Sequence, residues 1–288
     1  SFAYPSLLRC NSSRDNVFQL NSSYWRGIKF IEFAETINVI SGYKSAYEIG
    51  YGLALFQYFL SDIKKEQIIK TINNFHNTDF YIQCYEKVYK NITKIKPADI
   101  DLSVRLAKAN LFFRENINRV RGFQKEIALH VNRKFVIHGD PKMSNFMFNI
   151  KDNRFSAIID FDTISVGYLL TDLSDCLRSA CNLSGEDPNR LEDVNFDLQI
   201  CKYILEGYCS VPSNLISRQE FICLPHFTCL IIFELGIRFL TDFLESNRYF
   251  NVEYSSQNLY RAEVQFRLFD VLISRWDEFK YLVNQFCL

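Results

Sequence analysis

Two neighbouring segments, His138-Gly-Asp-Pro-Lys-Met-Ser-Asn145 and Ile158-Ile-Asp-Phe-Asp162, decide the fold of this sequence. The runs Arg133–Ile137 and Phe155–Ile159, which lead into them, have the apolar composition of short β-strands. Acidic, basic and amide side chains are therefore expected just beyond the ends of apolar strands. So many polar groups around one hairpin indicate a chemical site and not only a solvated surface.

The residue types and their spacing match what phosphoryl transfer needs. Asp140 and Asn145 lie five positions apart, as the Asp and Asn do in the catalytic-loop pattern of kinases. A carboxylate must accept the proton of the attacking hydroxyl, and oxygen ligands must hold Mg²⁺ on the nucleotide phosphates. Asp160 ends the second strand, where a metal-binding carboxylate is expected. The competing interpretation is a loop whose side chains only hydrogen-bond to the backbone.

Composition and charge exclude several classes of protein. The 288 residues carry 33 Lys and Arg against 33 Asp and Glu, and 48% of them are hydrophobic, which is typical of a globular protein. Zero net charge removes the electrostatic basis for general binding to nucleic acid or to an anionic membrane surface. Nine cysteines without a visible secretory signal predict reduced thiols, and no apolar run reaches the length of a membrane span. We therefore expect a cytoplasmic protein without nucleic-acid or membrane partners, and the sequence indicates no oligomeric state.

The periodicity predicts a strand-rich start, a helical body interrupted by a hairpin, and further helices. Turn residues in the first 33 positions predict a small antiparallel meander whose last strand is Tyr24–Glu32. Ser45 and Glu48 have the spacing of a capping box at the start of the first helix. The later helices are predicted at Lys64–Asn74, Thr78–Tyr89, from Asp99 to about His130, and after Asp172 with breaks at Gly185–Pro188 and Ser246–Ser256. The predicted strands are Arg133–Ile137, Phe146–Phe148 and Phe155–Ile159.

The two quoted segments resemble the aminoglycoside phosphotransferase and choline kinase superfamily, which shares the protein-kinase fold. The chain is more closely similar to N-acetylhexosamine 1-kinase and its relatives, through motifs spread over nearly its whole length. These motifs are Tyr24-Trp-Arg, Phe75-His-Asn-Thr78, Asp172-Leu-Ser-Asp-Cys-Leu-Arg-Ser-Ala-Cys-Asn182, Glu234-Leu-Gly-Ile-Arg-Phe-Leu-Thr-Asp242 and Asn258-Leu-Tyr-Arg261. The resemblance implies an α+β, protein-kinase-like fold of the aminoglycoside phosphotransferase type. In it, residues 1–34 would be a remnant of the N-terminal β lobe that ends in the hinge, and residues 35–288 the helical C-terminal lobe with the catalytic loop and substrate site.

The same resemblance implies roles in the reaction itself. Asp140 would be the catalytic base, and Lys142 would lie near the transferred phosphoryl group. Asn145 and Asp160 would bind Mg²⁺. For Asp162, structural support of the loop and direct contact with the metal both stay open.

Two further groups of residues would bind the nucleotide and the acceptor. The inter-lobe hinge, whose backbone would hydrogen-bond the adenine of ATP, includes Glu32, Phe33 and Glu35. The acceptor, a small-molecule sugar, would meet Asp175, Arg178, Arg238 and Tyr249. Arg238 stands on an otherwise apolar helix, which invites a buried anionic or hydroxyl partner, whereas Tyr249 is one of 16 tyrosines.

Several of these residues have a purely structural alternative. His138 would brace the catalytic loop instead of titrating in the reaction, and Asp172 would cap a helix or steady that loop. Lys142 has the alternative of an exposed loop lysine. Asp175 and Arg178 lie three positions apart, so a surface ion pair on one helical face is the alternative there.

Two parts that kinases of this fold use to hold the nucleotide phosphates are not visible, the glycine-rich loop and the strand lysine. Lys29 is followed at once by the hinge-like Phe30-Ile-Glu, so it is interpreted as an ordinary strand residue. We therefore expect the first part of the N-terminal lobe to be absent from this chain. The leading hypothesis is ATP-dependent phosphorylation of a sugar, at the anomeric hydroxyl of an N-acetylhexosamine. The alternatives are a kinase for an amino alcohol, an aminoglycoside or another sugar, and a truncated, non-catalytic kinase-like protein.

Overall fold

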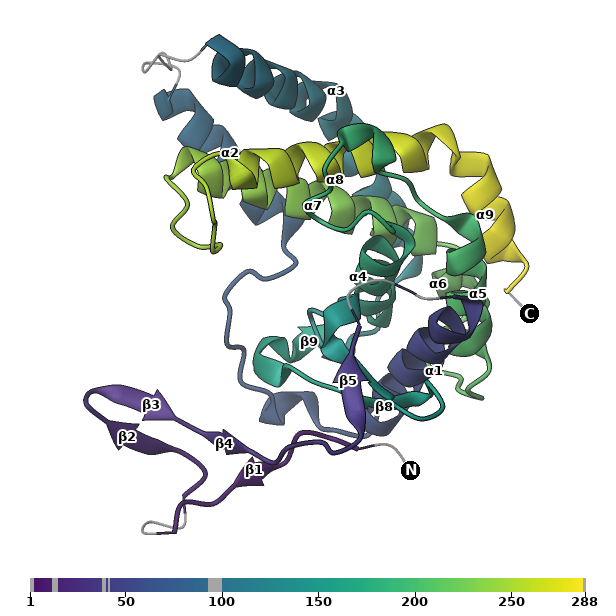
Figure 1. Ribbon diagram of the computed structural model, residues 1–288. Coiled ribbons are helices and arrows are strands. Elements are labelled where there is room, and N and C mark those ends of the chain that lie inside the picture. Colours follow the sequence, from purple (N-terminus) through teal and green to yellow (C-terminus); the bar gives the residue numbers. More distant parts are fainter. Residues whose placement is uncertain (1–2, 12–14, 38–39, 41, 93–99, 287–288) are drawn as a thin grey trace.

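The computed structural model describes residues 3–11, 15–37, 40, 42–92 and 100–286, and it has two unlike parts (Figure 1). The first part is an N-terminal arm of four short strands, β1 (Leu7–Leu8), β2 (Phe18–Leu20), β3 (Ser23–Trp25) and β4 (Gly27–Ile28). β1 pairs with β4 and β2 pairs with β3, both antiparallel, and the arm extends away from the helices. Short antiparallel strands are present as predicted, but the predicted meander is wrong, because β1 pairs with β4 and not with its neighbour β2. The last predicted strand, Tyr24–Glu32, is broken at Arg26 and ends at Ile28.

Two small sheets connect the arm to the helical body. β5 (Ala34–Thr36), β7 (Phe146–Asn149) and β8 (Phe155–Ile158) form an antiparallel sheet in the order β5-β7-β8. β6 (Phe135–Ile137) pairs with β9 (Ser165–Gly167). The predicted mid-chain strands are confirmed as β6, β7 and β8, whereas β5 and β9 lacked a recognised sequence signal. The loop of residues 138–145, which the sequence predicts to carry the catalytic base and which we call the catalytic loop for that reason, thus runs from one sheet to the other.

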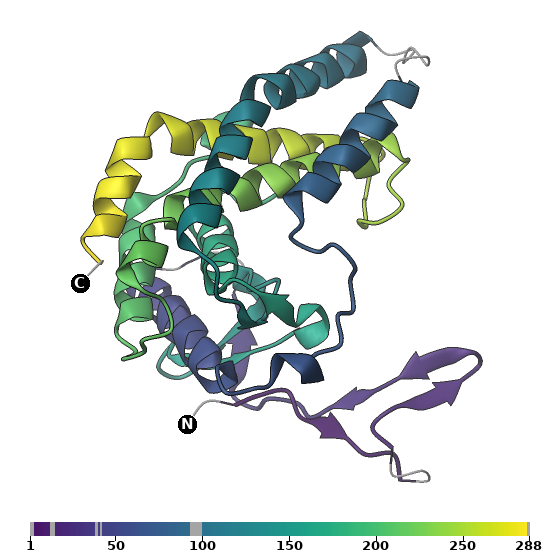
Figure 2. The ribbon, with the colours of Figure 1, turned by 180° about the vertical axis from the view of Figure 1, so that it is seen from behind.

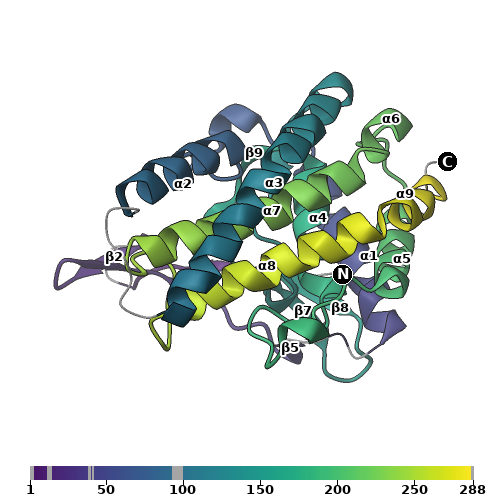
Figure 3. The ribbon, with the colours of Figure 1, turned by 90° about the horizontal axis from the view of Figure 1, so that it is seen from above.

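Helices make up most of the rest of the chain. They are α1 (Tyr43–Leu60), α2 (Thr78–Ile92), α3 (Ile100–His130), α4 (Leu169–Cys181), α5 (Leu198–Cys209), α6 (Arg218–Phe221), α7 (Leu224–Leu244), α8 (Gln257–Ser274) and α9 (Trp276–Asn284). α7 and α8 form a helical hairpin, and α3 crosses both of them, as Figures 2 and 3 show. α4 packs beneath α7, between that hairpin and the strands. Within the described residues, no helix is long and apolar enough to cross a membrane.

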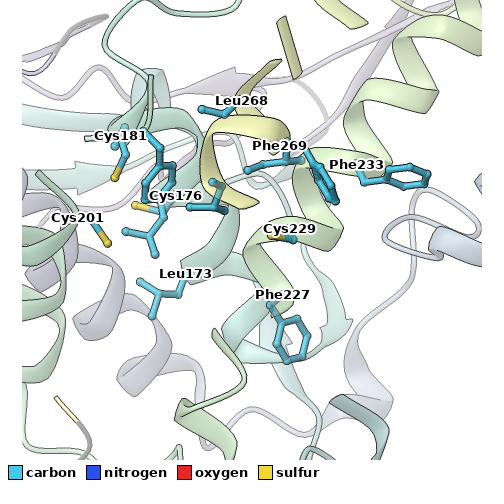
Figure 4. Packing of buried hydrophobic residues seen from close by; sticks show 14 of the residues in the cluster. Leu173, Cys176, Cys181, Cys201, Phe227, Cys229, Phe233, Leu268 and Phe269 are labelled. Atoms are coloured by element: carbon cyan, nitrogen blue, oxygen red, sulfur yellow. The ribbon is translucent and has the colours of Figure 1, made fainter. Parts of the chain in front are cut away.

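The hydrophobic core lies where α4, α5, α7 and α8 meet (Figure 4). Leu173 and Cys176 of α4 are fully buried there, as are Phe233 of α7 and Phe269 of α8. The Phe233 and Phe269 rings lie with their centroids 6.1 Å apart. Burial of side chains of this size supplies the main stabilisation of the fold.

A close helix crossing fixes α1 against α5. A Cβ atom added to Gly50 of α1 would lie 1.9 Å from the carbonyl oxygen of Ile204, and one added to Gly207 of α5 would lie 1.9 Å from that of Tyr47. Both distances are far inside van der Waals contact, so the two backbones approach each other only because each helix has a glycine at the crossing. This contact holds α1 beneath the β7–β8 hairpin, which α1 also contacts.

Two local predictions are wrong, and tertiary contacts explain both. The segment predicted as a helix at Lys64–Asn74 forms only a 3₁₀ turn at Lys65–Gln67, because the chain then bends and turns over residues 71–76 and Thr71 hydrogen-bonds the Asp162 carbonyl. The predicted capping box is also absent, since α1 begins at Tyr43, before Ser45. The Ser45 hydroxyl instead accepts a hydrogen bond from Asn153, and the Glu48 carboxylate accepts one from the Phe155 amide. Both side chains therefore hold the β7–β8 hairpin instead of the helix end.

Candidate active site

A buried carboxylate holds the start of the catalytic loop. The Asp172 side chain of α4 accepts hydrogen bonds from the amides of His138, at 2.8 Å, and Gly139, at 2.9 Å. Burial raises the pKa of Asp172 to about 6, although both hydrogen bonds lower it. Of the two structural alternatives for Asp172, steadying of the loop is the one observed.

The backbone at Gly139 requires glycine. Its φ is +89°, and an added Cβ would lie 2.4 Å from the carbonyl oxygen of Thr163. A side chain at this position would be strained and would also collide with the backbone. Gly139 thus lets the loop turn sharply just before Asp140.

His138 braces the other side of the loop. Its Nε2 donates to the Ile159 carbonyl at 2.9 Å, while its Nδ1 accepts from the Asp140 amide at 3.3 Å. Burial lowers the pKa of His138, which fits this neutral tautomer. The ring contacts Phe56 and Phe161, so it lies inside the protein. The bracing role proposed for His138 agrees with this geometry.

Asp140 is partly buried on this loop and contacts Lys142. The Lys142 Nζ lies 2.9 Å from Asp140 Oδ2, so Lys142 is not a free loop lysine. Burial raises the pKa of Asp140, and the nearby Asp175 raises it further, against the lowering effect of Lys142. A carboxylate with a raised pKa is a better proton acceptor than an ordinary one.

Asn145 and Asp160 lie next to each other, across the start of the β7–β8 hairpin. The Ile159 amide donates to the Asn145 carbonyl at 2.9 Å, which joins the two segments directly. The Asn145 side-chain nitrogen donates to the Asp140 carbonyl at 2.8 Å, which leaves its side-chain oxygen available as a ligand. Asp160 is exposed and has left-handed backbone, with φ 68° and ψ 64°.

Asp162, for which two roles were open, is engaged by the N-terminal arm. Arg26 forms an ion pair with its carboxylate, and Thr71 donates to its carbonyl at 2.6 Å. The Asp162 side chain is therefore used in a contact between the arm and the helical body.

A cavity of about 290 Å³ opens beside Asp140 and Lys142. Its wall includes Asp175, Arg178 and Glu186, and Arg178 Nε lies 2.7 Å from Asp175 Oδ1. Both side chains of this pair are buried, so the alternative of a surface ion pair is wrong. α4 is covered by α7 at this point, and Arg178 also bonds Glu186 at 3.1 Å. We call this space the acceptor cavity.

Arg238 lies in the same wall, inside an aromatic cage. Its guanidinium carbon is 5.0 to 5.8 Å from four ring centroids, those of Phe75, Tyr81, Tyr249 and Phe250. No carboxylate of the described chain forms an ion pair with it. The cationic group is thus stabilised by ring faces and keeps its hydrogen-bond donors for other partners.

The loop that brings Tyr249 and Phe250 to this cage is held by Asp242 of α7. The buried Asp242 carboxylate accepts from the amides of Arg248, Tyr249 and Phe250 at 2.8 to 3.0 Å. It also accepts from the Asn258 side chain at 2.9 Å. One helix residue therefore fixes one side of the acceptor cavity.

The proposed site residues fall into three places. The acceptor cavity brings together Asp140, Lys142, Asp175, Arg178, Arg238 and Tyr249. Asn145 and Asp160 lie on the hairpin side of Asp140. The proposed hinge residues Glu32, Phe33 and Glu35 lie at the edge strand β5 or just before it, where Glu35 pairs with Phe148 of β7.

Sequence reasoning gave no role to His76, Glu234 or Asp242, although each belongs to a motif quoted for the resemblance. His76 bonds the Gly139 carbonyl at 2.6 Å, and Glu234 lines the acceptor cavity. The signal that could have found them is a polar residue within an apolar helical run, as at Glu234 and Asp242.

Comparison with known proteins is consistent with this geometry. Residues 93–196, which include the catalytic loop and α4, match the model of the phosphotransferase enzyme family. An aminoglycoside phosphotransferase from Alicyclobacillus acidocaldarius superimposes with a TM-score of 0.64 at 11% identity, covering 98% of this chain and 77% of that one. A choline kinase from Cryptosporidium parvum gives 0.57 at 12%, with coverage of 98% and 77%. The GDP complex of aminoglycoside 2'-phosphotransferase-IIIa gives 0.54 at 14%, with coverage of 92% and 76%.

These likenesses establish the fold. It is a protein-kinase-like fold of the aminoglycoside phosphotransferase type, with a small strand-rich N-terminal part and a larger helical C-terminal part, as the sequence predicted. The family match adds that residues 93–196 are similar in sequence to the phosphotransferase enzyme family.

Proposed function

We propose that this chain transfers the γ-phosphoryl group of ATP to a hydroxyl group of a neutral sugar, with an N-acetylhexosamine as the preferred acceptor. The observation that carries the proposal is Asp140. It stands at the edge of the acceptor cavity on a loop held by Asp172, His138 and Gly139, and its pKa is raised by burial.

In the proposed reaction Asp140 acts as the proton acceptor. The acceptor hydroxyl loses its proton to the Asp140 carboxylate as its oxygen bonds to the γ-phosphorus, and the bond from that phosphorus to the β–γ bridging oxygen breaks to release ADP. Lys142, 2.9 Å from Asp140, places a positive charge beside the transferred group. Both residues lie on one short loop, so their separation is set by the backbone.

The residues present fit a magnesium ion. The Asn145 side-chain oxygen and the Asp160 carboxylate are hard oxygen ligands on adjacent segments, and Asp160 has no hydrogen-bond or ion-pair partner among the described residues. Within the same residues no group of three or more His, Cys, Asp and Glu can hold a metal, so phosphates and water would complete the coordination. When bound, the ion would supply positive charge to the nucleotide phosphates.

Arg238 supports an acceptor with neutral or anionic oxygens over a cationic one. A cage of aromatic rings is the chemistry that recognises organic cations, and here the guanidinium of Arg238 already fills it. A quaternary or primary ammonium would therefore find both the cage taken and a like charge beside it. Sugar hydroxyl and carbonyl oxygens, in contrast, can accept hydrogen bonds from Arg238. Amino alcohols and aminoglycosides remain the alternative acceptors.

The proposed division of the chain follows from the same assignment. Residues 1–34 would end the N-terminal lobe and residues 35–288 would form the catalytic lobe, with Glu32, Phe33 and Glu35 at the hinge for the adenine. In support, β5 leaves the arm and pairs directly with β7, the strand that follows the catalytic loop. A non-catalytic, kinase-like role is the remaining alternative, because no glycine-rich loop or strand lysine is visible in the sequence.

An assay of ADP release tests the proposal. The 288-residue chain is incubated with saturating Mg-ATP and one of three acceptors, namely N-acetylglucosamine, N-acetylgalactosamine or choline. We expect release with at least one of the two sugars, little with choline, and loss of about 10³-fold or more of kcat in Asp140→Asn.

A matched control separates chemistry from folding. Asp197 caps α5 through one carboxylate oxygen, and an Asn keeps that cap, so Asp197→Asn should retain activity. Calorimetry with Mg-ATP then separates the outcomes. Nucleotide binding without ADP release for any acceptor would contradict the proposal, and release only with choline would select the alternative acceptors.

A further inference from the structure

A partly buried histidine lies between the acceptor cavity and a second cavity. His76 lies just before α2, and together with Phe75 and Glu234 it lines both the acceptor cavity of about 290 Å³ and a neighbouring cavity of about 440 Å³. Neither the proposed chemistry nor the proposed nucleotide site uses it. Its two ring nitrogens point to two different parts of the site.

One ring nitrogen of His76 must carry a proton. Its Nε2 lies 2.6 Å from the carbonyl oxygen of Gly139, the residue before Asp140. A carbonyl oxygen only accepts hydrogen bonds, so Nε2 is the donor. The His76 ring therefore anchors the backbone of the catalytic loop.

The other ring nitrogen faces a carboxylate. Nδ1 of His76 lies 3.4 Å from Glu234 Oε1, which is within ion-pair distance, and it forms no hydrogen bond with any described residue. The second carboxylate oxygen accepts a hydrogen bond from Thr78 at 2.8 Å, so Glu234 is held in place and buried. An unprotonated Nδ1 would place its lone pair close to that carboxylate, whereas protonation of Nδ1 gives the ring a positive charge at ion-pair distance from Glu234.

We propose that His76 is a positioning residue that works as a doubly protonated imidazolium. It ties the Gly139 carbonyl to Glu234 of α7, and so it fixes the loop that carries Asp140 relative to the wall of the acceptor cavity. The effect on turnover rests on the proposed function. The protonation state of His76 and its hold on the loop stand independently of any activity.

The surroundings of His76 favour its charged form. Three carboxylates face it, Glu234 from α7 and Asp172 and Asp175 from α4. Burial lowers the pKa of His76, but Glu234, the Gly139 carbonyl and Asp175 together outweigh burial, and the pKa is raised from 6.5.

Other charged groups lie in the walls of the two cavities. The acceptor cavity contains Asp140, Lys142, Arg178, Glu186, Arg238 and Arg261, and the second cavity contains Lys70, Asp79 and Lys134. Arg178 is neutralised by Asp175 and Glu186, Lys142 by Asp140, and Arg261 by Asp187. Arg238 is the cation on α7 whose charge would oppose protonation of His76. Its guanidinium is held among aromatic rings, those of Phe75 and Phe250 included.

A titration by nuclear magnetic resonance tests the protonation state directly. The sequence has four histidines, so the ring signals of His76 can be assigned with single variants. We expect His76 to titrate above pH 6.5, while His138 and His226, whose pKa values burial lowers, titrate below it. His226 is the matched control, because its Nδ1 is also buried without a partner but lies outside the site. Titration of His76 below 6.5 would overturn the proposal.

The variant Glu234→Gln sharpens that test. Removing the carboxylate should lower the pKa of His76, while the Gln side chain can still donate to a neutral Nδ1. An unchanged His76 titration in this variant would also overturn the proposal.

Amide hydrogen exchange tests the hold on the loop without any need for turnover. His76→Phe removes both contacts and fills similar space, so exchange at residues 138–145 should rise about tenfold or more, with α8 unchanged. His76→Gln can keep a donor for the Gly139 carbonyl and should restore part of the protection. Equal loop exchange in all three proteins would reject the positioning role.

Turnover supplies a separate readout. With an accepted substrate, kcat should fall about tenfold as pH rises through the pKa of His76, with KM for the acceptor nearly constant. Glu234→Gln should shift this alkaline limb to lower pH. If the alkaline limb lies at the same pH in Glu234→Gln, the link between His76 and catalysis is rejected. Absence of turnover with every acceptor would instead count against the proposed function. The titration and exchange results would then decide on His76.

Discussion

Aromatic side chains are exposed in the N-terminal arm but buried in the helical body. Trp25 of the arm is 53% exposed and Tyr24 is 75% exposed, whereas Phe233 and Phe269 of the body are fully buried. None of the residues in strands β1 to β4 is buried, and the large apolar side chains there are 43% to 75% exposed. The helical body therefore has a hydrophobic core of its own, whereas the apolar side chains of the arm stay exposed to solvent.

This contrast indicates that the helical body supplies most of the free energy of unfolding and also carries the candidate site. The arm is tied to the body through Ala3, whose amide donates to the Ser156 carbonyl, and through the ion pair of Arg26 with Asp162. The loop of residues 138–145, in contrast, is held by the buried Asp172 of α4, by the Ile159 carbonyl just after β8 and by His76. A two-stranded hairpin without a covered face is marginal in water. Substitutions in the two parts should therefore differ strongly in their effect.

The largest difference is expected between two phenylalanines. Phe269→Ala in α8 should lower the free energy of unfolding by about 3 to 5 kcal/mol, because a fully buried ring is lost from the core. Phe18→Ala in β2 should change it by less than about 0.5 kcal/mol, since that side chain is already exposed. Urea unfolding of both variants measures this. Similar losses at the two positions would show that the arm is packed in solution.

A smaller effect is expected at the brace of the catalytic loop. Asp172→Asn should lower the free energy of unfolding by about 1 to 3 kcal/mol, because the Asn amide sets a donor against one of the two loop amides. Asp197→Asn is the matched control, since one oxygen makes both of its bonds and Asn keeps that oxygen. Urea unfolding again gives the comparison. Equal changes in the two variants would argue against the role of Asp172.

The His76 pair adds a pH dependence that the arm lacks. The pKa of His76 is raised in the folded state, so its stabilisation is fully present below pH 6.5 and is lost as pH rises through the folded-state pKa. The free energy of unfolding, measured from pH 6.5 upward, should therefore fall in the unchanged protein. His76→Gln should flatten this slope, and Arg26→Ala should leave it unaltered. A slope of the same size in His76→Gln would assign it to another group.

The smallest effect is expected where arm and body meet. Arg26→Ala removes an ion pair whose side chains are 47% and 57% exposed, so it should cost between about 0 and 1 kcal/mol. Raising the salt concentration should reduce even this difference. A loss above this range would mean that the arm shields Asp162 from water, and it would weaken the contrast between the two parts.

Residue type and hydrophobic periodicity predicted the secondary structure well where short-range interactions determine it. β6, β7 and β8 and helices α2 and α3 follow from residue type and periodicity. The helix predicted at Lys64–Asn74 fails because Thr71 must reach Asp162 and His76 must reach Gly139, with left-handed backbone at Asn74 and His76. Contacts between distant segments overrode the local preference.

The candidate site was only partly accessible to sequence reasoning. Asp140, Asn145 and Asp160 all lie in the two neighbouring segments between residues 138 and 162, so their proximity could be predicted. The cage around Arg238 draws its rings from three separate segments, and its assembly depends on the Asp242 contacts with the loop after α7. Burial of the Asp175–Arg178 pair likewise depends on α7 covering α4. No spacing rule contains that information.

The left-handed backbone at Asp160 narrows the substitutions that this position can accept over evolutionary time. With φ 68° and ψ 64°, Gly, Asn and Asp are the residues that fit with the least strain. Of these three, Asp alone has a charge. Neutral drift at position 160 therefore leads first to Asn or Gly, which keep the fold and lose the carboxylate. A lineage that no longer needs the chemistry should show this change before its core begins to decay.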